Sequence, residues 1–422
     1  MREVAVYVHV PFCEFKCGYC DFCALQIGTS KSNEKLNTLV DEFKWTLRAE
    51  LLGRAEILRT CQVSSVFFGG GTPTILKAED ICFIIQEINN FSRGILEGAE
   101  ITVETNPGIR FGQRQKYLST LHSGGVNRLS VGVQSFDAQV LRTLERTQEV
   151  QDVQGIVQEA KQLGLKINLD LIYGTPAETL ESWENSVKSA VKLDADHLSL
   201  YALTLEDGVR LAKQIKRGKL VQVDEDFQAL KYERADEILQ NSGYDWYEVS
   251  NWEKLSDKPG ENRSTHNLNY WLNGEYIGIG PSAHSSLRVD STTRSQNALT
   301  VSKRFWNISA VYEYVQLVRD GKLLVEAEEV LNEREKLYES ALLRARLNAP
   351  ITNCTYKTLE KLIAAELVNP EDFRPTVKGR LLNDEIVRIL VEDELQNRTN
   401  SARSCPKYNT SQCLSCPQCV ME

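Results

Sequence analysis

The sequence of 422 residues lacks any apolar stretch of the roughly 18 residues that a membrane-spanning helix needs. No run of basic residues reaches five, and the formal net charge is −9. That charge argues against nucleic acid or an anionic membrane as a bulk partner. The short apolar segment 4–12 lacks a small-residue cleavage site and runs into a cysteine cluster, so it favours a strand over a signal peptide. We therefore expect a cytoplasmic protein.

Internal repeats are also absent, and the composition is ordinary for a protein with a full core, with 42% hydrophobic and 25% charged residues. The 11 cysteines are an odd number, which argues against a pure disulfide framework. Four of them lie in segment 13–23 and four in segment 405–419. In a reducing compartment such clusters indicate metal binding. Cys61, Cys82 and Cys354 are scattered and resemble small buried hydrophobic residues.

The first half of the chain alternates β-branched segments with amphipathic helical segments. Strands are expected at 3–10, 63–68, 100–104, 128–133, 165–173 and 197–203. Strands separated by helices indicate a parallel sheet, and right-handed crossovers curl it into a complete or partial (β/α) barrel. The functional side chains of such barrels lie at the carboxyl ends of the strands. Three close cysteines follow the first strand and three glycines follow the second.

The alternation of strand and helix patterns ends after about residue 205. A strand at 244–249 and a Gly/Asn-rich stretch precede a helical pattern from about 305 to 394. Segment 376–382 is interpreted as a short β wing before the last helix. We thus expect an α/β partial barrel followed by a smaller, winged-helix-like α+β domain. The expected division is a core barrel at 1–205, a barrel extension at 206–300, the C-terminal domain at 301–395 and a flexible, cysteine-rich tail at 396–422.

The segment CEFKCGYC places Cys13, Cys17 and Cys20 on one tight loop. Three thiolates can hold three irons of a [4Fe–4S] cubane and leave the fourth iron open to an amino-acid chelate. A zinc site remains an alternative because Cys23 could supply a fourth ligand. The glycines of FFGGGTPT allow backbone to approach a ligand closely at the strand end.

Eight segments carry a resemblance in the same order along residues 4–394. They are YVHVPFCEFKCGYCDF, FFGGGTPT, ITVETNPG, NRLSVGVQSF, INLDLIYGTP, YALTLEDG, HNLNYW and YIGIGPSAH. Together they resemble the HemN/HemW group of radical-SAM proteins, which implies a radical-SAM barrel. The resemblance implies that Cys13, Cys17 and Cys20 hold a [4Fe–4S] cluster. It also implies contacts to S-adenosylmethionine (SAM) from Tyr7, Tyr19, Gly70, Gly71, Thr72, Glu104, Gln134, Arg146 and Asp170.

Charge complementarity agrees with this implied set. Glu104 and Asp170 can pair with an ammonium group or accept hydrogen bonds from ribose hydroxyls, and Arg146 can pair with a carboxylate.

Two features indicate the haem chaperone-like HemW branch. Phe22 stands where the oxidase branch has a fourth cysteine, and only a short segment precedes Tyr7. Members of this branch are not expected to oxidise coproporphyrinogen III, so enzymatic activity stays open, with the oxidase as the alternative.

The resemblance further implies haem as a ligand and haem-accepting respiratory proteins as partners. His266 of HNLNYW is the implied haem ligand, and His284 of GPSAH is a second candidate. A homodimer and membrane association through partners are left open. The tail lies outside the resemblance: Cys405, Cys413, Cys416 and Cys419 could bind a second cluster or zinc, or be spare thiols.

Overall fold

The computed structural model describes residues 2–28, 34–109, 112–290, 300–322, 324–352 and 354–404. The four tail cysteines lie outside these residues. Contacts divide the chain into two compact units. The first comprises Met1–Trp246 and Ser250–Val330, and the second comprises Tyr247–Val249 and Leu331–Glu422. The finer four-part division drawn from the sequence stays a proposal.

The first unit is built on a sheet of 12 strands in the order β14-β13-β12-β11-β1-β4-β5-β6-β7-β8-β10-β9. Its centre consists of the six strands expected from the sequence. They are β1 (Arg2–Val10), β4 (Cys61–Gly70), β5 (Ile95–Thr105), β6 (Arg128–Gln134), β7 (Lys166–Tyr173) and β8 (His197–Ala202). Each pairs in parallel with the next. The α/β fold with an open, partial barrel is confirmed.

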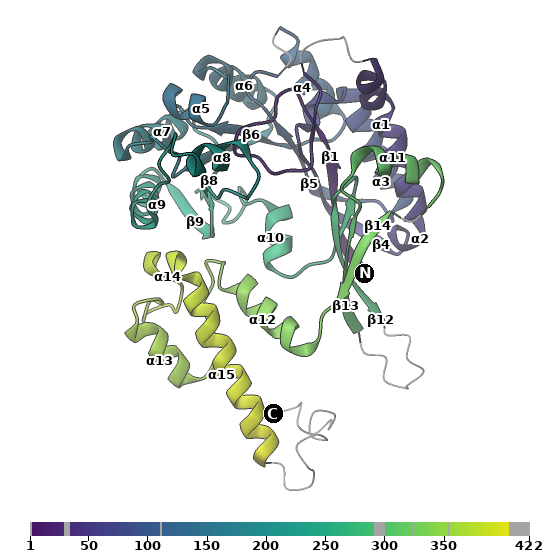
Figure 1. The fold of residues 1–422 in the computed structure, drawn as a ribbon. Coiled ribbons are helices and arrows are strands. Elements are labelled where there is room, and N and C mark those ends of the chain that lie inside the picture. The colour runs from purple at the N-terminus through teal and green to yellow at the C-terminus, as the bar shows by residue number, and fades with distance from the viewer. Residues whose placement is uncertain are drawn as a thin grey trace. The chain divides into compact units, whose positions relative to one another are not determined.

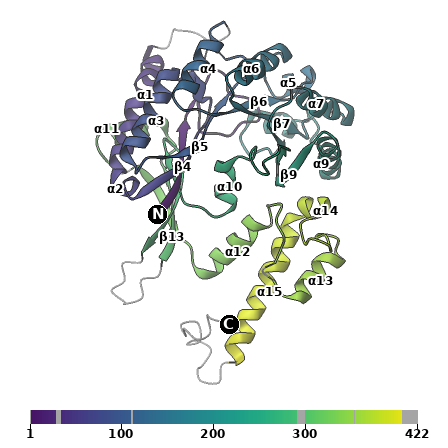
Figure 2. The ribbon, with the colours of Figure 1, turned by 180° about the vertical axis from the view of Figure 1, so that it is seen from behind.

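Helices follow these strands, and the longer ones cover the outer face of the sheet (Figures 1 and 2). They are α1 (Glu34–Gly53), α2 (Ala55–Leu58), α3 (Ala78–Phe91), α4 (Arg114–Ser123), α5 (Ala138–Thr143), α6 (Val150–Gln162), α7 (Leu180–Lys192), α8 (Arg210–Lys216) and α9 (Glu225–Gln240). Helix α7 shows why they form. Thr179 and Ser182 make a reciprocal capping box at its start, and Trp183, Val187 and Ala190 form one buried stripe.

Further strands extend the sheet at both edges, where β11 is parallel to β1 and antiparallel pairing begins at β11–β12 on one side and at β8–β10 on the other. Next to β1 lie β11 (Tyr276–Ile279), β12 (His284–Asp290), β13 (Thr300–Asn307) and β14 (Val325–Val330), and beyond β8 lie β10 (Asn251–Lys254) and β9 (Tyr244–Glu248). The helical pattern expected from residue 305 is wrong over β14 and the end of β13. β14 is an edge strand of mostly exposed residues, VEAEEV, so burial leaves no alternating pattern in its sequence.

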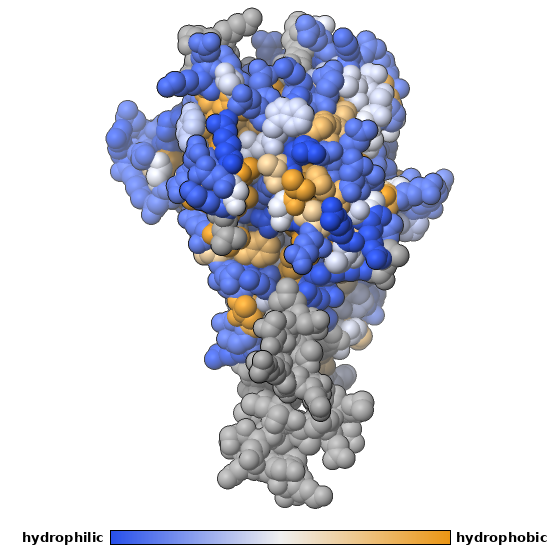
Figure 3. Space-filling model, turned by 90° about the vertical axis from the view of Figure 1, so that its right-hand side faces the viewer, coloured by the Kyte–Doolittle hydropathy of each residue, from blue (hydrophilic) through white to orange (hydrophobic). Residues whose placement is uncertain are grey.

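Two helices complete the first unit, α10 (Thr265–Trp271) and α11 (Val311–Arg319). Helix α11 packs on α1. No helix among the described residues is both long and apolar enough to span a bilayer. The side of the molecule in Figure 3 is largely hydrophilic, with hydrophobic side chains in small groups near its centre.

The second unit is helical, with α12 (Glu333–Arg344), α13 (Tyr356–Ala364), α14 (Val377–Leu381) and α15 (Asn383–Ser404) around a small core that includes Leu362 and Ile386. The wing expected at 376–382 is wrong, because this segment forms α14. The hydroxyl of Thr376 accepts the Gly379 amide and caps the helix. An isolated antiparallel bridge between Val368 and Pro375 lies just before it.

Candidate cluster and nucleotide site

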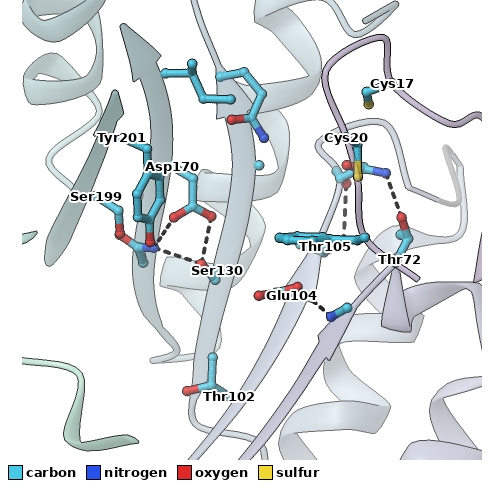
Figure 4. Close-up of a pocket in the computed structure, with 18 of the residues that line it drawn as sticks. Cys17, Cys20, Thr72, Thr102, Glu104, Thr105, Ser130, Asp170, Ser199 and Tyr201 are labelled. Carbon is cyan, nitrogen blue, oxygen red and sulfur yellow. Dashed lines mark hydrogen bonds between the residues drawn. The ribbon is translucent and has the colours of Figure 1, made fainter. Parts of the chain in front are cut away.

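The three cysteines of the first motif lie on a loop at the carboxyl end of β1. Cys13, Cys17 and Cys20 are partly exposed and line a cavity of about 560 Å³ inside the barrel (Figure 4). The loop is fixed at its centre, where Gly18 accepts a hydrogen bond from the Leu211 amide at 2.8 Å. Burial raises the pKa of the Cys13 thiol to about 11, so a bound metal is what would favour its thiolate.

Cys23 does not join the three cysteines at the cavity. Its thiol donates to the Ser309 carbonyl at 2.9 Å, and its own carbonyl lies 2.8 Å from Nε2 of His9. Among the described residues, no group of three or more His, Cys, Asp or Glu side chains could hold a single metal ion. In a [4Fe–4S] cubane each of the three cysteines binds a different iron, so the cluster does not require three side chains around a single metal ion. The geometry therefore disfavours a zinc site with Cys23 as the fourth ligand.

The glycines at the end of β4 are required by close backbone approach. Gly70 has φ +107°, and a Cβ there would lie 2.5 Å from the His9 ring. A Cβ on Gly71 would lie 2.5 Å from the carbonyl oxygen of Phe12. The Thr72 amide donates to that same carbonyl at 2.7 Å. The glycine turn thus packs directly against the start of the cysteine loop.

Two half-buried carboxyl groups face the cavity (Figure 4). Glu104 is the last residue but one of β5 and accepts the Gly70 amide at 3.2 Å, while burial, and then the charge of Asp170, raises its pKa to about 8. Burial also raises the pKa of Asp170, although Ser130 and Asn168 donate to it at 2.9 and 2.8 Å. Groups of this kind favour a cationic ligand, because a cation would stabilise their ionised forms.

Arg146 connects the cysteine loop to the neighbouring strand ends. Its guanidinium donates to the Cys17 sulfur at 3.4 Å, to Oδ1 of Asn106 at 2.9 Å and to the Gly132 carbonyl at 2.5 Å. Its Nε is buried and has no partner among the described residues. Asn106 also donates to Thr72 at 3.2 Å. Sequence reasoning missed Asn106, although the motif ITVETNPG contains it directly after a strand end.

The remaining expected SAM contacts also line this cavity. The Tyr7 hydroxyl lies 3.1 Å from Nδ1 of His9, and burial raises the pKa of both Tyr7 and Tyr19. Gln134 has φ +65°, a conformation that is rare for a residue other than glycine and often marks functional sites. The structure thus gathers all nine expected SAM residues and the three cysteines around one cavity. Their individual roles stay predictions.

Helix α10, with the sequence THNLNYW, closes the opposite end of the cavity. His266 is 1% exposed, and both of its ring nitrogens have partners: Ser65 Oγ at 2.9 Å and the Tyr270 hydroxyl at 2.9 Å. Burial lowers the pKa of His266 to about 3, so the ring is neutral. Both hydrogen bonds would have to break before His266 could bind iron. The haem contact expected of His266 stays a prediction.

The start of α10 is fixed by a buried acid that sequence reasoning also missed. Glu100 accepts the amides of Thr265 and His266 at 3.0 and 3.1 Å, and Arg128 lies 3.6 Å from it. A carboxylate is favourable at a helix N-terminus because it satisfies free amides there. Glu100 belongs to the strand segment AEITVET, where the pattern gives no sign of a helix-capping role.

Comparison with known proteins agrees with this geometry. Residues 7–190 match the Radical SAM superfamily. A protein named heme chaperone HemW from Mycobacterium tuberculosis is 34% identical over 398 residues, which cover 92% of this chain and 95% of that protein. The chain belongs to the HemW family of radical SAM proteins. The HemN/HemW resemblance expected from the motifs is confirmed.

Other HemW relatives and one solved structure extend the comparison. Heme chaperone HemW from Bacillus subtilis is 31% identical over 350 residues, 82% of this chain and 84% of that protein. The structure of coproporphyrinogen III oxidase (HemN) from Escherichia coli superposes with a TM-score of 0.73 at 22% identity and covers 92% of this chain and 90% of the other. At that identity the match shows the shared fold alone. The radical SAM family implies a [4Fe–4S] cluster and SAM.

Features of this chain fit both the [4Fe–4S] cluster and SAM. Three cysteines face one cavity, the glycine turn lines it beside them, and the Nε of Arg146 is a donor with no partner among the described residues. An anionic group could accept a hydrogen bond from Arg146 Nε, and the half-buried carboxyl groups of Glu104 and Asp170 suit a cation. SAM carries both kinds of charge.

Proposed function

We propose that this chain is a haem chaperone of the HemW type. In this proposal Cys13, Cys17 and Cys20 hold a [4Fe–4S] cluster, the barrel cavity binds SAM, and haem is carried to respiratory target proteins. The observation that carries the proposal is the meeting of three cysteine side chains, a glycine turn and Arg146 at one cavity, in a chain related over 92% of its length to a protein named heme chaperone. The cytoplasm is the proposed location.

The residues of the cavity would act by binding and orientation. Gly70 and Gly71 let the turn pack against His9 and Phe12, Thr72 and Asn106 hold the loop, and Arg146 neutralises negative charge next to Cys17. A reduced cluster would supply one electron for the cleavage of a sulfonium bond, which is chemistry of the bound group. Whether this chain performs that cleavage is a separate question from haem delivery.

Metal analysis tests the cluster assignment. Anaerobically reconstituted wild-type protein should be brown and contain about four irons per chain, or more if the tail binds a second cluster. Cys13→Ala should lose about four irons because two thiolates cannot complete the site. Cys82→Ala is the matched control, since Cys82 lies on α3 outside this cavity. Equal iron in wild type and Cys13→Ala would contradict the assignment.

A transfer assay tests the chaperone function against the oxidase alternative. Haem-loaded protein should pass haem to a haem-free respiratory acceptor, seen as the acceptor's own Soret spectrum. The reduced, cluster-loaded protein should form no appreciable protoporphyrinogen from coproporphyrinogen III and SAM. Formation of that product at a catalytic rate would favour the oxidase function and contradict the proposal.

A further inference from the structure

The segment 210–219, RLAKQIKRGK, carries five basic residues and no acidic residue, although the whole chain has a formal net charge of −9. It comprises α8 and the turn after it, and all five basic residues are exposed. We call Arg210, Lys213, Lys216, Arg217 and Lys219 the α8 basic patch. A local patch whose charge is opposite to that of the whole chain is suited to an acidic partner.

Two of the five charges are used within the protein. Arg210 pairs with Glu145, and Lys216 pairs with Asp207 at 2.6 Å. The other three basic side chains of the patch make no ion pair with any residue that the structure describes. Their charge is therefore available to attract an incoming molecule.

Helix α8 is attached directly to the cysteine loop. The Leu211 amide donates to the Gly18 carbonyl at 2.8 Å, and Arg210 donates to the Lys16 carbonyl. Leu211 also belongs to a small buried apolar cluster against which Tyr19 of the loop packs. Because Gly18 directly follows the second cysteine of the motif, a partner bound on the patch would lie next to the proposed cluster.

The patch starts at the loop and extends along one side of the helix. Arg210, Lys213, Gln214 and Arg217 are spaced three, four and seven positions from the first, so they share a side. Gln214 donates to Glu145 at 3.5 Å, the same acid that pairs with Arg210. At a rise of 1.5 Å per residue, Arg217 lies roughly 10 Å along the helix from Arg210. That extent suits the contact area of a small protein.

Exposed aromatic side chains lie beside the patch. Phe15 is 50% exposed and Phe22 is 57% exposed, and both belong to the cysteine loop and line the cavity. Lys16 joins them to α8, because its Nζ donates to the Phe22 carbonyl at 3.3 Å while its own carbonyl accepts from Arg210. Aromatic residues bordered by charged ones are typical of protein–protein interfaces. A cluster on this loop must also receive an electron before it can cleave a sulfonium bond.

We propose that the α8 basic patch, with Phe15 and Phe22, is the docking surface for a small acidic electron-transfer protein that reduces the cluster. In this step the donor protein loses one electron and the oxidised cluster gains it. The basic side chains attract the donor, and the two aromatic side chains become buried in the contact. This inference rests on the cluster of the proposed function.

Reduction by a purified flavodoxin, a small acidic flavoprotein, tests the proposal on the anaerobic, cluster-loaded, full-length protein. The patch variant combines Lys213→Glu, Arg217→Glu and Lys219→Glu. Reduced flavodoxin should bleach its cluster at least about tenfold more slowly than that of the wild type at low salt, and added salt should slow the wild type. Calorimetric titration with oxidised flavodoxin should show correspondingly weaker binding. Dithionite, which needs no docking surface, should reduce both proteins alike.

A matched control carries the same change of net charge elsewhere. It combines Arg59→Glu, Lys192→Glu and Lys258→Glu, three exposed residues that make no ion pair with a described residue. Arg59 precedes β4, Lys192 precedes β8, and Lys258 follows the end of β10 that pairs with the start of β8. All three thus lie at the strand ends opposite the cysteine loop. This control should be bound and reduced by flavodoxin as the wild type is.

The outcomes separate the two proposals. If the wild type shows no cluster that dithionite can bleach, the cluster of the proposed function fails and this inference fails with it. If dithionite reduces the wild type but flavodoxin does not, or if the patch variant matches the wild type with flavodoxin, the inference is overturned and the cluster stands. Equal losses in both triple variants would also overturn it, as would a patch variant that loses only its binding to phosphatidylserine vesicles. Weaker binding and slower reduction in the patch variant alone support it.

Discussion

At the scale of single residues, burial decides the chemistry of the cavity. Glu104 and Asp170 are carboxyl groups that an isolated reading of the sequence would place in solvent. In the folded chain both are half-buried, and burial, followed by the charge of Asp170, raises the pKa of Glu104 to about 8. Asn106, Glu100 and Arg128 were not found from the sequence because each acts on a segment distant along the chain. Their roles follow from contacts that only the fold creates.

Glu104 makes SAM binding dependent on pH. Below about pH 8 the acid is protonated in the ligand-free protein, and a cationic ligand must displace that proton, so SAM affinity should rise by up to about tenfold per pH unit until pH 8 and then level off. Calorimetric titrations of the anaerobic, cluster-loaded protein at several pH values measure this. Glu104→Gln should bind SAM more weakly and without this rise.

The exposed acid Glu97 on the same strand provides the control. Glu97→Gln should retain the full pH dependence of the wild type. The same raised pKa affects stability with a definite sign. Because the folded pKa lies above the unfolded value, the contribution of Glu104 is complete at low pH and is lost as the pH rises to about 8. A SAM affinity that stays flat from pH 6 to 8 in the wild type would refute the role of Glu104.

At the scale of elements, the strand ends determine where the ligands meet. The six central strands and their order could be predicted because each is a β-branched run between helical segments. Among the outer strands, β9 was also predicted, at 244–249, but β14 could not be, since it is exposed and its pairing depends on a neighbour rather than on its own pattern. Segment 376–382 shows the converse error. Thr376 caps a helical turn there, and only its contacts distinguish that turn from a wing.

Gly71 tests whether the glycine turn supports the cysteine loop. Gly71→Ala should place a Cβ 2.5 Å from the Phe12 carbonyl oxygen and push the loop away from β4. We expect a large loss of cluster iron, at least half, with a fall in stability of about 1–3 kcal/mol from overpacking. Gly53→Ala is the control: it ends α1 with nothing within 4 Å of the added Cβ, and should leave iron content and stability close to wild type. Normal iron binding in Gly71→Ala would show that the turn accommodates the added Cβ and that the cysteine loop does not depend on this glycine.

At the scale of the whole molecule, one buried acid attaches the added strands to the barrel. Glu50 of α1 is 2% exposed and accepts hydrogen bonds from Arg54, Asn307, Gly280 and Tyr314 at 2.5–2.9 Å. These partners come from the residue that links α1 to α2, from β13, from the turn after β11 and from α11. A buried charge with this many donors stabilises only as a complete set.

Removing that charge should loosen the added strands β11 to β14 together with the rest of the first unit. Glu50→Gln turns one acceptor into a donor and leaves the Arg54 guanidinium without its counter-charge, so we expect a loss of about 3–5 kcal/mol. Glu42→Gln on the same helix breaks an exposed pair with Arg319 and should cost under about 1 kcal/mol. The midpoint of urea denaturation, followed by tryptophan fluorescence, measures both. Equal midpoints would mean that the Glu50 contacts contribute little.

The sequence by itself determined the central parallel sheet, the cysteine loop, the glycine turn and the family, because these depend on local periodicity and on motifs read along the chain. Tertiary structure alone decided which side chains meet. The Cys23 thiol donates a hydrogen bond to the Ser309 carbonyl, both ring nitrogens of His266 are hydrogen-bonded, and the His284 ring stacks on Trp306. The physical reason is that burial and hydrogen-bond partners come from segments brought together by folding, and no pattern within one segment encodes its partner.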